Sequence, residues 1–184
     1  MSPAPPSDPG ALLDEQAAHY RARAPEYDEW WLRTGRYDRG PEALAINQAR
    51  LAAAGLAPAR HVEADLFAWQ PDALYDVVFF SFWLSHVPED RFERFWQTVG
   101  AALRLGGRAF LIDSLPDETS TARDHRMPDE DGRQERRLND GRSFQIVKLF
   151  RGPADLTARL SALGWTAELS RTATYFVHGH ACRP

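Results

Sequence analysis

The sequence predicts a three-layer α/β sandwich built on a mostly parallel sheet. Helix-like and strand-like segments alternate through the middle of the chain, an order typical of that class. Two of the strand-like segments, Asp76–Phe82 and Arg108–Asp113, are nearly continuous apolar runs, as expected for central strands covered on both faces. The chain has 184 residues, 43% of them hydrophobic, which suits one domain with a substantial core.

The N-terminal part predicts a short leader followed by a helix. Met1–Pro9 is rich in proline and small residues, and we expect it to be disordered; residues 10–184 would form the single domain. Apolar side chains then recur at helical spacing, at Leu12, Leu13, Ala17 and Tyr20. Pro25 is expected to break or restart this helix.

The next two elements are predicted from their end signals. Ala43–Ala54 is rich in helix-forming residues and lies between Gly40-Pro41, a helix start, and Gly55, a helix stop. A short strand is expected at about Arg60–Ala64.

The centre of the chain predicts a strand, a helix and a second strand. The helix follows Asp76–Phe82 and ends at Gly106-Gly107, before the strand Arg108–Asp113. Its apolar residues keep a helical period: Phe92, Phe95, Trp96, Val99, Ala102 and Leu103. Ligands of open α/β sheets bind at the carboxyl ends of the strands, which directs attention to Ser81–His86 and Asp113–Ser114.

The C-terminal third predicts a helix and two closing strands. Leu115–Asn139 is polar and without clear periodicity, so we expect a long excursion, before a candidate strand at Arg142–Phe150. Pro153–Leu163 reads as a helix that starts at proline and stops at Gly164. The short segments Trp165–Ser170 and Thr174–His178 can pair as antiparallel strands.

Composition excludes several classes of protein. A net charge of −4 gives no support for nucleic-acid binding, and no apolar run is long enough for a membrane helix. Cys182 is the only cysteine, which rules out an internal disulfide and favours a reducing, cytoplasmic setting. His125 and the acidic run Asp129–Asp131 are too loosely spaced to predict a metal site.

Several segments, taken in order, resemble a class I S-adenosylmethionine-dependent methyltransferase of the small-molecule type. The segments that carry the resemblance are Tyr20–Asp28, Glu63–Leu66, Tyr75–Phe80, Phe82–Pro88, Leu103–Arg108, Leu111–Asp113 and Tyr175–Gly179. The resemblance implies a Rossmann-like fold, S-adenosylmethionine as cofactor and a small-molecule substrate.

The resemblance also assigns roles to residues. Asp65 would accept a hydrogen bond from the adenine amino group, while Leu66 would offer its backbone N–H. Phe82 would line the methionine end of the cofactor. His86 would act near the substrate as a general base.

Aromatic residues of the N-terminal part of the chain would complete the cofactor site. Tyr20 and Tyr27, with Trp30 and Trp31, would form a lid whose ring faces suit the sulfonium cation.

Each of these residues also has a structural interpretation. Asp65 can be a helix N-cap or a surface carboxylate, and Phe82 can be core packing. His86 can be a neighbour of the helix that follows it. The aromatic residues of the first helix can pack against the sheet.

The chain departs from the family at the junction Gly40–Pro41. The family places a first strand, a glycine-rich turn and an acid-ended second strand before the helix equivalent to Pro41–Ala54, and about 50 residues of this kind are missing here. We therefore expect a fold truncated at the cofactor half. Two functions follow: methyl transfer to a small molecule, or a non-catalytic remnant that forms a homodimer through the exposed sheet edge.

Overall fold

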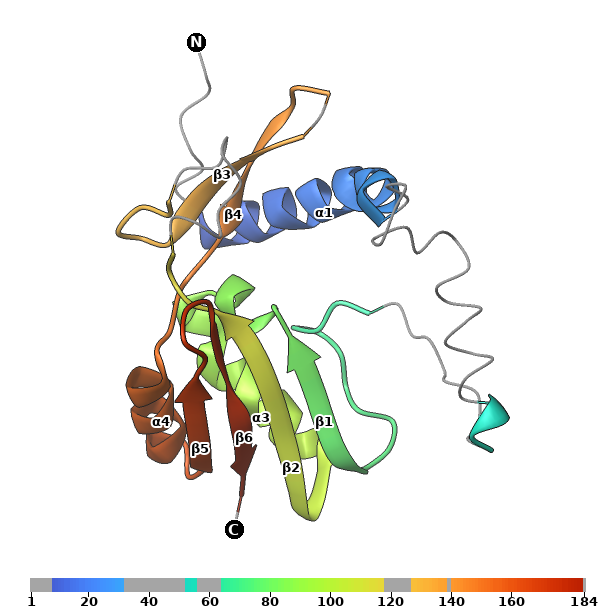
Figure 1. Cartoon of the computed structure of the whole chain (residues 1–184), viewed down its shortest axis with the longest axis vertical. Helices are drawn as coiled ribbons and strands as arrows, with labels where there is room; N and C mark the ends of the chain where they lie inside the picture. Colours follow the sequence, from blue (N-terminus) through green and yellow to red (C-terminus); the bar gives the residue numbers. More distant parts are fainter. Residues whose placement is uncertain (1–7, 32–51, 56–63, 118–126, 139, 184) are drawn as a thin grey trace.

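The computed structural model describes residues 8–31, 52–55, 64–117, 127–138 and 140–183. In Figure 1 a sheet with helices packed beside it forms the lower half of the molecule, and a helix with a hairpin lies above them. The elements are α1 (Pro9–Trp31), β1 (Tyr75–Ser81), η1 (Leu84–His86), η2 (Glu89–Arg91), α3 (Phe92–Ala102), β2 (Leu103–Ser114), β3 (Arg133–Arg137), β4 (Ser143–Val147), α4 (Pro153–Ala162), β5 (Thr166–Arg171) and β6 (Phe176–Cys182).

The main sheet has four described strands in the order β1-β2-β6-β5. β1 and β2 are parallel, whereas β6 is antiparallel to both β2 and β5. The Rossmann-like α/β fold and the antiparallel C-terminal pair are thereby confirmed. Over the described strands the sheet is mixed, with one parallel pair and two antiparallel pairs.

The hydrophobic core lies between one face of this sheet and the helices α3 and α4. Alternate residues of each strand point to this face, because side chains alternate along a strand. The core side chains include Val78, Phe80, Ala109, Leu111, Val177 and Ala181 from the sheet, and Phe92, Phe95, Trp96, Val99, Leu156 and Leu160 from the helices.

The opposite face of β1 and β2 is exposed in the described part of the chain. Phe79 is 65% exposed, Val77 54% and Phe110 37%. β1 has a described neighbour on one side only. We expected Asp76–Phe82 to be a central strand covered on both faces. For the described sheet this is wrong, because the apolar side chains of the strand pack against other residues on one face only.

A second layer, formed by α1 and the β3–β4 hairpin, covers the carboxyl ends of β1 and β2 (Figure 1). The Glu15 carboxylate accepts a hydrogen bond from Gln145 N at 2.6 Å, and the Gln16 side-chain oxygen accepts one from Val147 N at 2.8 Å. These bonds attach α1 to the edge of β4. We call α1, β3 and β4 the cap.

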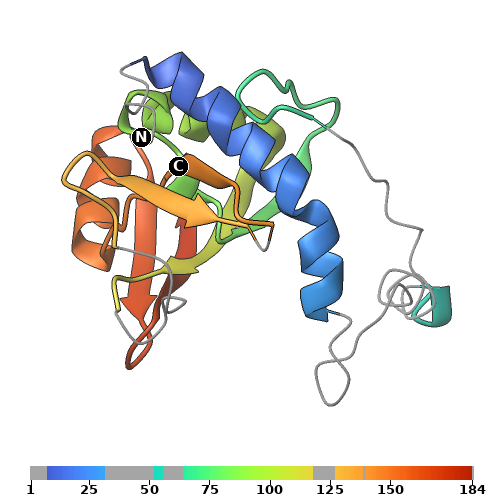
Figure 2. The same ribbon diagram turned by 90° about the horizontal axis from the view of Figure 1, so that it is seen from above.

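Two expectations about the cap are corrected. α1 does not end at Pro25 but continues to Trp31, with a change of direction in its second half (Figure 2); such bending is the usual result of a proline inside a helix. β3 lies inside the stretch predicted to be a long excursion. Its sequence is largely charged and gives no alternating pattern, so its pairing with β4 decides its structure.

The remaining boundaries agree with the sequence in part. α4 begins at Pro153 and is followed by Gly164 with φ +79°, as its end signals predict. α3 ends at Ala102, before Gly106-Gly107, because β2 already begins at Leu103. Ala52-Ala53 are helical and Gly55 has φ +69°, but the rest of the helix predicted at Ala43–Ala54 lies outside the described residues.

Other expectations also fall outside the described part of the chain. They concern the leader up to residue 7, the junction at Gly40–Pro41 and the strand predicted at Arg60–Ala64, of which only Ala64 is described. None of the described helices combines the length and the apolar character that crossing a membrane requires.

Candidate active site

The candidate site lies where the carboxyl ends of β1 and β2 meet the cap, as strand order in α/β sheets predicts. β1 leads into the turn η1, which carries Ser85 and His86, and β2 ends at Asp113–Ser114. Ser85 N donates a hydrogen bond to Asp113 Oδ2 at 2.9 Å, so the two strand ends are joined directly. The two segments that the sequence singled out are therefore brought together.

A cleft of about 850 Å³ opens between α1 and the segment 64–67. Three residues predicted to bind the cofactor line it: Tyr20, Asp65 and Leu66. Trp83 and Arg91 contribute from the segment after β1. A cleft of this size falls within the range of small-molecule sites.

Asp65 has a structural role and also borders the cleft. Its Oδ1 accepts a hydrogen bond from Phe67 N at 2.9 Å, and its backbone oxygen accepts one from Trp69 N at 2.7 Å, so the residue closes a turn. The carboxylate remains exposed and borders the cleft.

Phe82 and Tyr27 are not brought to the described cleft. Phe82 is absent from its lining; the ring is 48% exposed and packs edge-on to Phe176 with centroids 5.7 Å apart. Its φ of +53° lies in the left-handed region, which is uncommon for a bulky residue. Tyr27 belongs to α1, but its side chain lies outside the described residues, as do those of Trp30 and Trp31.

His86 is buried beneath the cap and hydrogen-bonded through its ring. Nδ1 lies 2.7 Å from the Val147 carbonyl oxygen and donates to it, so Nε2 is the acceptor for the Tyr20 hydroxyl at 3.1 Å. Burial, together with the nearby Lys148 charge, lowers the pKa of His86 to about 3. A ring held neutral in this way is a poor proton acceptor at pH 7, so the geometry does not support the predicted general base.

Lys148 is a buried cation next to His86. Its Nζ donates a hydrogen bond to Ser85 Oγ at 2.8 Å. Burial lowers the pKa of Lys148 to about 8, although the charge of Asp113 opposes that change. Both Asp113 oxygens accept hydrogen bonds from backbone amides, and among the described residues no carboxylate lies within ion-pair distance of Lys148.

The sequence reasoning missed Lys148 as a site residue. A signal was present, because Lys148 is the single lysine in a chain whose other 21 basic residues, of 22 lysines and arginines in total, are arginines. Its burial could not be read from the sequence, since it comes from the packing of the cap onto η1.

Comparisons with known proteins identify the family. No family model matches the chain, and no curated protein sequence matches it. Among solved structures, a complex described as DhpI with SAM and HEP is 31% identical, with a TM-score of 0.70 over 97% of this chain and 100% of the other. A DhpI–SAH complex is also 31% identical, with a TM-score of 0.69 over 96% and 98% of the two chains.

A third structure shares the fold at lower identity. It is the 1,6-didemethyltoxoflavin-N1-methyltransferase of Burkholderia thailandensis with 1,6-didemethyltoxoflavin and S-adenosylhomocysteine bound. It is 15% identical, with a TM-score of 0.56 over 98% of this chain and 92% of the other. Together with the mixed sheet and the cleft at its strand ends, these matches show that the chain belongs to the class I S-adenosylmethionine-dependent methyltransferases.

Proposed function

We propose that the chain transfers the methyl group of S-adenosylmethionine to an oxygen of a small anionic molecule. One observation carries the proposal: a cleft of cofactor size adjoins a layer that contains the buried Lys148 ammonium, which has no ion-pair partner among the described residues. A buried charge is costly unless it is paired, so a site that keeps one is suited to a ligand of opposite charge.

The cleft fits the adenosine part of the cofactor. Asp65 Oδ1 is engaged by a backbone amide, which leaves the second oxygen for an amino group, and Leu66 lies beside it. Tyr20 adds an aromatic face from α1. The DhpI structures hold SAM and SAH, which supports the same cofactor here.

The substrate side is formed by cations. Arg136 is close enough to Lys148 and to His86 for its charge to lower the pKa of both. An anionic group placed among these side chains would offset that repulsion. Tyr20 connects the two halves, because its ring lines the cleft while its hydroxyl bonds to His86.

The chemistry needs little help from an acid or a base. When bound, S-adenosylmethionine would supply the methyl group: a carbon–oxygen bond would form as the carbon–sulfur bond breaks, the anion would lose one negative charge and the sulfonium would become a neutral thioether. An anionic oxygen has no proton to lose, which agrees with a His86 that is neutral and weakly basic. The residues act by holding the oxygen in line, which is catalysis by proximity.

Titration calorimetry tests the proposal with S-adenosylhomocysteine and inorganic phosphate as separate probes. Asp65→Ala is expected to weaken S-adenosylhomocysteine alone, and Lys148→Met to weaken phosphate alone. A folded wild-type chain that gives no heat with millimolar S-adenosylmethionine or S-adenosylhomocysteine would overturn the enzyme function.

We also propose that the family's first strands and glycine-rich turn are missing at Gly40–Pro41. Val77 and Phe79 are exposed, and among the described strands β1 pairs on one side only. Both observations support the proposal, since neighbouring strands and a covering helix would bury the two side chains. The test is the DNA between the two codons. An in-frame segment that encodes a Gly-x-Gly turn would show an incomplete copy, and an uninterrupted codon pair would show that the short chain is natural.

The same exposed surface favours a second candidate function, a homodimer formed through β1. A strand edge beside exposed apolar side chains is a template for pairing with another chain. Light scattering after gel filtration should give twice the monomer mass, and Val77→Lys with Phe79→Lys should restore the monomer. A wild-type chain that is monomeric at high protein concentration excludes this function.

A further inference from the structure

The turn Leu84–Val87, which follows β1, is fixed by hydrogen bonds that its backbone carbonyls accept from other parts of the chain. Leu84 O and Val87 O both accept hydrogen bonds from the side chain of Arg151, at 2.8 and 3.0 Å. Between them, Ser85 O accepts one from Leu149 N at 2.7 Å. The carbonyl of His86 accepts a fourth, from the Gln16 side chain of α1 at 3.3 Å. Four consecutive carbonyl groups are thus fixed by residues distant in the sequence.

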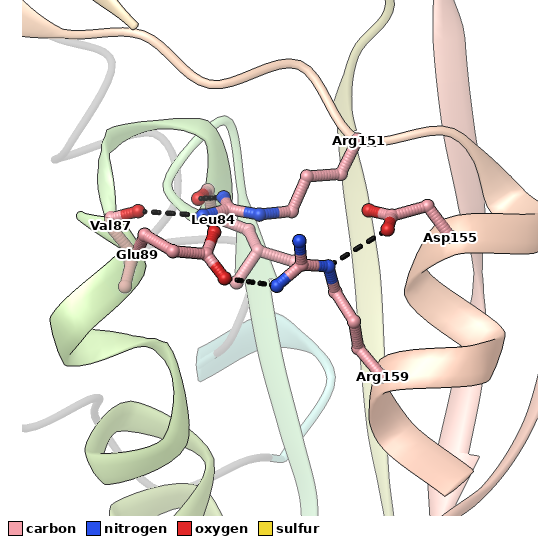
Figure 3. Close-up of polar contacts among 6 residues, drawn as sticks. All are labelled: Leu84, Val87, Glu89, Arg151, Asp155 and Arg159. Atoms are coloured by element: carbon pink, nitrogen blue, oxygen red, sulfur yellow. Dashed lines mark hydrogen bonds and ion pairs between the residues drawn. The ribbon is translucent and has the colours of Figure 1, made fainter. Parts of the chain in front are cut away.

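Arg151 supplies two of these four bonds from a buried position. Its guanidinium reaches across the turn with one nitrogen on each carbonyl (Figure 3). It also lies 5.1 Å from the centre of the Phe92 ring. Glu89 lies 3.4 Å from it, while the Glu89 carboxylate also pairs with Arg159 of α4. A planar fork with fixed donors suits a backbone clamp better than a flexible ammonium.

We propose that Arg151 is a positioning residue for the substrate site, acting through the turn Leu84–Val87. The turn sets two contacts of that site: Ser85 Oγ with Lys148 Nζ, and the His86 ring with the Tyr20 hydroxyl. Without the guanidinium, two carbonyls lose their side-chain donor and the turn is free to relax. The inference rests on the proposed function, because it concerns the same anion site.

Arg159 provides a matched control on the same network. It bonds to Glu89 and Asp155 and lies over the same Phe92 ring at 5.6 Å, but it contacts no carbonyl of the turn (Figure 3). Replacing it removes an arginine from the cluster and leaves the clamp in place. A difference between the two variants therefore reports on the bonds to Leu84 and Val87.

The experiment uses the full chain with isotope-labelled lysine, which gives one side-chain signal because Lys148 is the single lysine. We would measure the pKa of Lys148 by NMR for Arg151→Met and Arg159→Met. The dissociation constants of inorganic phosphate and S-adenosylhomocysteine are measured for these two variants and for Arg151→Lys, which adds a second lysine and is therefore judged by binding alone. In Arg151→Met, phosphate binding should weaken roughly tenfold, as expected when a binding group is slightly misplaced. The pKa of Lys148 should change with it, while S-adenosylhomocysteine binding stays within about twofold of wild type.

Arg159→Met should keep the wild-type pKa and phosphate affinity, and Arg151→Lys should restore part of the loss. If Arg151→Met does not fold, the phosphate affinity of Arg151→Lys is compared with that of Arg159→Met. A folded Arg151 variant with wild-type phosphate affinity and an unchanged Lys148 signal would overturn the positioning role. Failure of the anion site itself is distinguishable, because wild type and Lys148→Met would then bind phosphate equally.

Discussion

The two levels of the molecule are stabilised in opposite ways. On one face of the sheet, α3 and α4 cover a core layer of apolar side chains centred on Trp96 and Leu160, both fully buried. Above the carboxyl ends of β1 and β2, the cap covers a site layer of buried polar groups that includes His86, Lys148 and Arg151. Burial of apolar side chains in the core layer stabilises the fold. Burial of titratable groups in the site layer offsets part of that stabilisation.

The difference separates stability from function. A side chain of the core layer can be judged by its packing alone, as with the Trp96 ring that contacts Phe80, Phe92, Phe95 and Trp165. A buried lysine without an ion-pair partner is costly to keep in the ligand-free protein, despite its hydrogen bond to Ser85. The site layer is therefore where substitutions should raise stability and lower binding.

The largest effect is expected at low pH, where protonation of His86 should lower the free energy of unfolding. Its folded pKa of about 3 lies below the ordinary 6.5, so the unfolded chain takes up the proton first. Stability should be complete above about pH 6.5 and fall by up to roughly 5 kcal/mol as the pH drops towards 3. Chemical denaturation across this range checks the slope. His86→Gln, which cannot titrate, should show a flatter profile, and an equal slope in both proteins would contradict the assignment.

Removing Trp96 should damage the core layer and leave the site layer intact. Trp96→Ala should lower the free energy of unfolding by about 4 kcal/mol, through lost burial and the cavity left behind. Denaturant titration measures the loss, and Trp96→Phe, which keeps a ring, should lose less. Under conditions where Trp96→Ala remains folded, the pKa of Lys148 should equal that of wild type; a shifted value would show that the layers are coupled.

Lys148→Met is expected to have the opposite effect and to raise the free energy of unfolding of the ligand-free protein. Because burial lowers the pKa of Lys148 from 10.5 to about 8, the charged form costs roughly 3 kcal/mol at pH 7, and its removal should stabilise the ligand-free protein by up to that amount. The unfolded chain holds the lysine proton between pH 8 and 10.5, so wild-type stability should rise through that window and approach that of the variant. A variant less stable than wild type at pH 7 would refute this reading of the site layer.

The smallest effect is expected at the surface, at the ion pair of Arg104 and Asp76. Both side chains are mostly exposed, and the pair closes at 2.8 Å on the outer edge of the sheet. Arg104→Gln should change the free energy of unfolding by less than about 1 kcal/mol, as is usual for exposed pairs. A thermal melt at low and high salt is sufficient, and a large loss would mean that the edge of β1 depends on this pair.

The sequence predicted elements whose signals are local. α4 was found from Pro153 and Gly164, and α3 from its apolar period, because caps and periodicity act within one helix. β3 was missed because its stability comes from a partner strand rather than from its own residues. In the described sheet β1 lies at an edge rather than at the expected central position, because an apolar run predicts burial but does not supply the neighbours that provide it.

The site was predicted in its position and less well in its roles. Asp65, Leu66 and Tyr20 line one cleft, as the resemblance implied. The role given to His86 depended on its exposure, which is decided by α1, more than 60 residues away in the chain. The same packing buries Lys148, and no local pattern around either residue contains that information.

The attachment of α1 to β4 also governs when the site can form during synthesis. Glu15 and Gln16 leave the ribosome some 130 positions before their partners, Gln145 and Val147. Translation proceeds at about 5–20 residues per second, so α1 waits several seconds without the strand it binds. Until β4 emerges, α1 cannot make these bonds, and the candidate site cannot assemble before β4 does.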